Sequence, residues 1–150
     1  MFEVPVAVAK LSALVTDIMK DDADSGDIPE VPVPSVRSDI LSKVIDFCTH
    51  YKAEPMNEIE KPLKSHKMDE IVQKWYADFV DVDQEALFEI IVAANFLNIQ
   101  PLLDLTCASV AGLIKGKTPE EIRNTFNIIN DFTPEEEAQV REENKWCEEA

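Results

Sequence analysis

One short pattern has the residue types of a phosphate-binding loop, and another resembles part of a calcium loop. Gly116-Lys117-Thr118 matches the end of the phosphate loop, but that loop needs a glycine where Ala111 stands and has to follow a strand. The acidic segment 21–27 has its glycine one position too early for a calcium loop, and a valine takes the place of the final glutamate. The sequence therefore predicts neither nucleotide nor calcium binding.

The cysteines and histidines are the remaining candidates for a metal site or for nucleophilic catalysis. Cys48 and His50 are two positions apart, whereas His66 and Cys107 are remote, so the sequence has no helical i, i+4 ligand pair. No serine or cysteine lies in the glycine-flanked turn of a nucleophile elbow. We therefore predict no catalytic residue, no metal and no cofactor, and interpret the protein as a non-enzyme.

The composition fits one ordinary domain, because 45% hydrophobic residues suffice to fill a core. The formal net charge of -16 repels phosphate backbones and anionic membranes and attracts basic protein surfaces, so we expect no nucleic-acid or membrane partner. Cys48, Cys107 and Cys147 are odd in number and widely spaced, which indicates a reducing compartment. The longest apolar run is interrupted by Glu89 and Asn95. We expect a cytoplasmic and nuclear location.

Hydrophobic spacing predicts two short strands and a series of helices. Segment 2–6 alternates as a strand does, while segment 31–34 can be at most an edge strand because its prolines lack N–H donors. Helical spacing covers residues 8–18, 38–48, 68–79, 84–97 and 98–116. Segment 84–97 has almost no polar face, so we expect it to be the buried centre. Segment 51–67, with Pro55 and Pro62, has the composition of a surface insertion.

The last segment contains the sequence T-P-E-E twice, at 118–121 and 133–136. Each copy combines a capping threonine, a proline at the first helical position and a glutamate that can complete a capping box, so two short helices are predicted. The apolar side chains of this segment are too few for their burial to offset the entropy cost of ordering it. We infer that it folds fully against another chain with Trp146 as an anchor; the alternative is a tail packed on its own domain.

Several longer motifs cover the second half of the chain. They read AANFLNI at 93–99, LLDLTC at 102–107, IKGKTPEEIR at 114–123, FNI at 126–128, NDFT at 130–133 and NKWCEE at 144–149. With these motifs the chain resembles the Skp family, the F-box-binding adaptor subunits of SCF ubiquitin ligases, over about three-quarters of its length.

The resemblance implies an α+β fold, with a POZ/BTB-like small sheet flanked by helices over residues 1–115. Two additional C-terminal helices, which bind the F-box, follow over residues 116–150. Family members begin with one more strand before the one at Phe2, and its absence here leaves an unpaired sheet edge. Segment 57–75 also departs from the family, since it carries lysines where relatives tend to be acidic.

The resemblance also implies two sets of binding residues. Asn95 and Phe96 would face a cullin. The F-box would be bound by Leu103, Val110, Ile114, Phe126, Ile128, Trp146 and Cys147. Periodicity alone favours a place in the core for Leu103, Val110 and Ile114 over a place at a binding face. Pro134 stands where some relatives carry a proline that is hydroxylated and then glycosylated, although helix capping also explains it.

The resulting expectation is a non-catalytic adaptor of an SCF-type E3 ubiquitin ligase, which connects a cullin to F-box substrate receptors in ubiquitin-dependent protein degradation. One alternative is an elongin C-like POZ module, which lacks the paired tail helices. Another is a self-associating POZ protein that would dimerise weakly through the exposed sheet edge.

Overall fold

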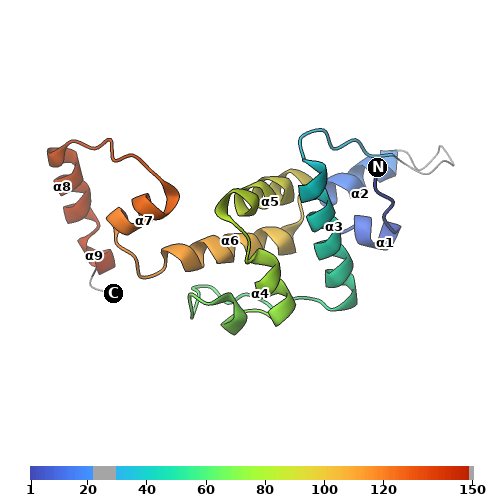
Figure 1. Cartoon of the computed structure of the whole chain (residues 1–150), viewed down its shortest axis with the longest axis horizontal. Coiled ribbons are helices and arrows are strands. Elements are labelled where there is room, and N and C mark those ends of the chain that lie inside the picture. Colours follow the sequence, from blue (N-terminus) through green and yellow to red (C-terminus); the bar gives the residue numbers. More distant parts are fainter. Residues whose placement is uncertain (22–29, 149–150) are drawn as a thin grey trace. The chain divides into compact units, whose positions relative to one another are not determined.

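The computed structural model describes residues 1–21 and 30–148, and the chain divides into two compact units at Lys115 and Gly116 (Figure 1). The helices of the first unit are α1 (Val6–Ala9), α2 (Ala13–Asp21), α3 (Ser38–Ala53), the 3₁₀ turn η1 (Met68–Glu70), α4 (Lys74–Val80), α5 (Gln84–Leu97) and α6 (Gln100–Ile114). The second unit contains α7 (Pro119–Phe126), α8 (Pro134–Glu143) and α9 (Lys145–Glu148).

The core of the first unit lies where α5 packs between α3 and α6, as Figure 1 shows. Asp83 starts α5 as predicted, because its carboxylate accepts a hydrogen bond from the Ala86 N–H at 2.8 Å. The largest fully buried side chains are Tyr76, Phe47, Ile90, Ile99, Leu102, Leu105 and Thr106. The Phe47 ring contacts three further aromatic rings at centroid distances of 5.6 to 5.8 Å, which joins α3 to α4.

The predicted α+β class is wrong. Helices make up 64% of the structure, and residues 1–21 and 30–148 contain no strand and therefore no sheet edge. A strand needs backbone N–H donors and a partner strand. In segment 2–6, the first predicted strand, Pro5 instead precedes helix α1. Segment 31–34, the second, has no N–H at either proline and continues into a turn. The sheet edge required for the self-association alternative is accordingly absent from the described residues.

The insertion predicted for residues 51–67 is irregular from residue 54 onward, whereas residues 51–53 still belong to α3. The irregular part is anchored to the first unit. The Gln73 side chain accepts from the Asn57 N–H and donates to the Pro55 carbonyl, both at 2.9 Å. The His66 carbonyl lies so close to α6 that a Cβ at Gly112 would meet it at 2.8 Å, so glycine permits this approach.

In the second unit both T-P-E-E segments start helices, as predicted. Each forms a complete capping box, in which the threonine hydroxyl accepts from the glutamate N–H at 3.3 Å and the glutamate carboxylate accepts from the threonine N–H. Ion pairs join α7 to α8, with Arg123 and Glu137 3.3 Å apart. None of residues 116–147 is buried.

Candidate partner-binding surfaces

The residues considered for chemistry are dispersed. Gly116 follows helix α6, with a left-handed φ of 76°, and the calcium-like segment 22–27 lies outside the described residues. Cys48 is buried, which raises the pKa of its thiol to about 11, while Cys107 is exposed. The described residues hold no cluster of metal-ligating side chains and no helix long and apolar enough to cross a bilayer.

Helix α5 exposes one apolar stripe. The α5 stripe consists of Phe88, Val92 and Phe96, which are 40%, 64% and 42% exposed and lie four residues apart on one face of the helix. Asn95 is exposed beside its C-terminal end, so the structure brings the two residues predicted to face a cullin together. The prediction that the whole helix is buried is wrong for Phe88 and Val92, because α3 and α6 cover only the other side.

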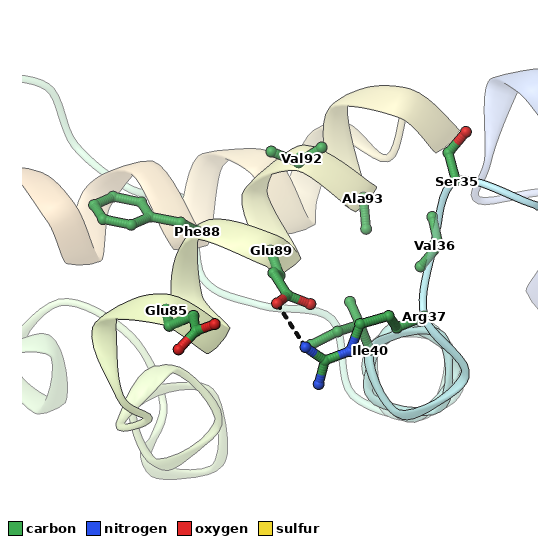
Figure 2. A pocket seen from close by; sticks show the side chains of 9 residues that line it. All are labelled: Ser35, Val36, Arg37, Ile40, Glu85, Phe88, Glu89, Val92 and Ala93. Carbon is green, nitrogen blue, oxygen red and sulfur yellow. Dashed lines mark hydrogen bonds and ion pairs between the residues drawn. The ribbon is translucent and has the colours of Figure 1, made fainter.

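A groove of about 430 Å³ lies between α5 and the start of α3 (Figure 2). Its lining residues are Ser35, Val36, Arg37, Ile40, Glu85, Phe88, Glu89, Val92 and Ala93. Arg37 reaches across the groove, with its Nη1 2.8 Å from Glu89 Oε1. A second hydrogen bond from Arg37, to the Asp39 carboxylate, lowers the pKa of Asp39. An apolar lining with two glutamates at the rim suits the apolar side chains of a protein partner better than an anion.

Helix α6 places the three F-box candidates of this unit on one face. Leu103 and Val110 are half-buried against the core, so their positions fit a role in the core as well as a role in F-box binding. Ile114 is 37% exposed. Cys107 lies on the same face, four residues after Leu103 and three before Val110, and is exposed. Cys107 was not among the residues predicted to bind the F-box, although its i, i+4, i+7, i+11 spacing with Leu103, Val110 and Ile114 could have indicated it.

The second unit exposes most of its apolar side chains. Phe126 is half-buried at the end of α7, whereas Ile128 and Trp146 are 53% and 71% exposed, and Cys147 is exposed in α9. The other exposed large apolar residues of this unit are Ile129, Phe132 and Val140. Pro134 is exposed at the first position of α8. A compact unit with so many exposed apolar side chains is typical of a protein-binding module.

Exposed apolar faces on both units thus define the class: a helical protein-interaction module. The Skp1 family tetramerisation domain matches residues 1–53, and the Skp1 family dimerisation domain matches residues 100–147. The chain belongs to the Skp1 family, as its motifs predicted.

Individual relatives are similar along almost the whole chain. The S-phase kinase-associated protein 1 homolog of Tetrahymena thermophila is 53% identical over 151 residues, which is 100% of this chain and 89% of the relative. The E3 ubiquitin ligase complex SCF subunit sconC of Arthroderma otae is 50% identical over 94% of this chain and 84% of its own length. The protein of that name from Arthroderma benhamiae is 49% identical, over 95% and 85%.

Proposed function

We propose that this chain is the adaptor subunit of an SCF-type E3 ubiquitin ligase and that it links a cullin to F-box substrate receptors. The observation that carries the proposal is the 50% identity, over 94% of the chain, to a protein named as an SCF subunit. The presence of α7 and α8 favours this adaptor over an elongin C-like module, which lacks the paired tail helices.

The cullin binds, in this proposal, at the exposed face of α5. Asn95 and Phe96 stand at one end of the α5 stripe, and the groove beside Val92 continues the apolar surface toward Arg37 and Glu89. Removing apolar side chains from water is the main source of affinity in such interfaces, and the charged rim sets the register of the partner. Val92, as the most exposed residue of the stripe, stands to lose the most contact with water.

The F-box protein binds the outer face of α6 and the second unit. The 71% exposure of Trp146 supports this assignment, because large aromatic residues are frequent anchors of protein interfaces. The absence of buried side chains in residues 116–147 supports a unit that gains its apolar burial from the partner. Leu103, Val110 and Ile114 are the residues of α6 that we assign to the same partner.

The mechanism is positioning. The F-box protein brings a substrate, the cullin brings the ubiquitin-conjugating machinery, and this chain binds both at once. No residue of the chain performs chemistry in this proposal. The corresponding location is cytoplasmic and nuclear.

A capture experiment tests the bridge. An immobilised N-terminal fragment of a cullin should retain an F-box protein only when this chain is added, because neither partner is expected to contact the other directly. Replacing Asn95 and Phe96 by alanine should reduce retention of the chain itself, whereas Trp146→Ala should reduce only retention of the F-box protein. Asp46→Ala, at an exposed position of α3 outside both surfaces, is the matched control. Equal retention of the F-box protein with and without the chain would contradict the proposal.

A further inference from the structure

Ser12 is a buried polar side chain that serves two helix ends at once. It is 5% exposed and immediately precedes α2. Its Oγ accepts a hydrogen bond from the Val15 N–H at 3.1 Å, and its hydroxyl donates to the Leu97 carbonyl at 2.5 Å. Helices leave their first N–H groups and last carbonyls without internal partners, so one hydroxyl satisfies a donor of α2 and an acceptor of α5.

The end of α5 shows why the second of these bonds matters. Asn98 is in the left-handed conformation, with φ 51°, and its N–H donates back to the Asn95 carbonyl at 3.1 Å. The Ile99 N–H donates to the Ala94 carbonyl at 2.9 Å, as in a Schellman motif. These bonds satisfy inner carbonyls of the helix but leave the carbonyls of its outermost residues to other donors.

The start of α2 and the residue before it supply donors to this end of α5. Ser12 bonds the Leu97 carbonyl, and the next residue, Ala13, donates its N–H to the Asn98 carbonyl at 3.2 Å. Two consecutive residues therefore hold two consecutive carbonyls from a part of the chain 85 residues away. This clamp fixes the final turn of α5, on which Phe96 directly precedes Leu97.

We infer that Ser12 is a positioning residue for the cullin-facing turn of α5, an inference that rests on the proposed function. Because Ser12 is buried, it offers little surface to a partner; it acts by setting the backbone under Asn95 and Phe96. The segment over α1 and α2 is thereby part of the cullin-binding machinery although it lies far from α5 in the sequence.

The test measures the affinity of the full chain for an N-terminal cullin fragment and for an F-box domain by calorimetry. Ser12→Ala should weaken cullin binding by about tenfold, the equivalent of one buried hydrogen bond, and leave F-box binding within about twofold. Ser12→Thr retains a hydroxyl and should restore most of the cullin affinity. A chain in which Ser12→Ala binds the cullin fragment as the wild type does, or loses both partners equally, overturns the positioning role.

Thr16→Val is the matched control. The Thr16 hydroxyl donates to the carbonyls of Ser12 at 2.8 Å and Lys10 at 3.3 Å, so it belongs to the same segment but makes no bond to α5. Its removal should leave both affinities within about twofold. A loss of cullin affinity as large as that of Ser12→Ala would assign the effect to general loosening of α2 and overturn the inference.

A second measurement needs no variant and so does not depend on whether Ser12→Ala folds. In the wild-type chain, the hydrogen-exchange rates of the Ala13 and Val15 amides should fall when the cullin fragment binds. The same rates should stay unchanged when the F-box domain binds. Unchanged exchange in the cullin complex overturns the inference alone. Failure of the wild-type chain to bind the cullin fragment overturns the proposed function as well.

Discussion

The two units of this chain differ in the interactions that stabilise each of them internally. In the first unit, α3 and α6 start without any side-chain cap, and their stability comes from a core that includes Phe47 and Leu105. In the second unit, α7 and α8 each have a complete capping box, yet none of residues 116–147 is buried. Short helices gain little stability in water from local bonds alone. The second unit therefore relies on its capping boxes and ion pairs where the first unit relies on a buried core.

The largest expected contrast is between truncations of a phenylalanine in each unit. Phe47→Ala should lower the free energy of unfolding by about 3–5 kcal/mol, because it empties the centre of the aromatic cluster between α3 and α4. Phe132→Ala, at a 45% exposed position of the second unit, should lower it by less than about 1 kcal/mol. Denaturant unfolding measures both, and equal losses would remove the distinction between the units.

The next effect concerns binding. Trp146→Ala should weaken F-box binding by about 2 kcal/mol or more without changing the unfolding transition of the first unit, since a 71% exposed side chain contributes little to the free fold. Val92→Ala, which is 64% exposed on α5, is the matched variant and should weaken cullin binding but not F-box binding. If both variants affected the same partner, the assignment of one partner to each surface would be wrong.

Sequence predicted the locally coded parts of this fold best. Asp83 and the two capping threonines make bonds to residues three positions away, so their helices follow from spacing alone. The sheet, which the resemblance implied, was wrong. A strand forms only if a distant segment pairs with it, and the local spacing in segments 2–6 and 31–34 does not encode that pairing.

The candidate surfaces were predicted in part. The motif around Asn95 and Phe96 indicated one end of the α5 stripe, and both residues are exposed. The exposure of Phe88 and Val92 depends on which side of α5 is covered by α3 and α6, and an apolar helix sequence does not encode that side. The bond from Ser12 to Leu97 joins residues too far apart in the sequence for any local pattern to predict it.

A smaller effect tests the local stabilisation of the second unit. Thr133→Ala removes the hydroxyl that accepts from the Glu136 N–H and should reduce the stability of α8 by about 1 kcal/mol, visible as a loss of helical circular dichroism in the free chain. Ser38→Ala at the start of α3, whose first turn has no side-chain cap, should change stability by less than about 0.5 kcal/mol. A larger effect at Ser38 than at Thr133 would reverse the comparison.

The smallest perturbation is chemical labelling of the cysteines. At about pH 8 a neutral alkylating reagent should modify Cys107 and Cys147 but not Cys48, because burial raises the pKa of the Cys48 thiol to about 11 and keeps it protonated and inaccessible. Mass spectrometry locates the label, and Cys48 should react only after the first unit unfolds. Labelling of Cys48 in the folded chain at the rate of Cys107 would contradict the burial that distinguishes the units.

Calorimetric titration with a purified F-box domain tests whether the second unit carries an F-box-binding site. The full chain and a version that ends at Lys117, which retains the first unit, are titrated side by side. We expect the full chain to bind the F-box domain tightly and the truncated version to lose this binding. Equal binding by both versions, or no binding by the full chain, would contradict this expectation.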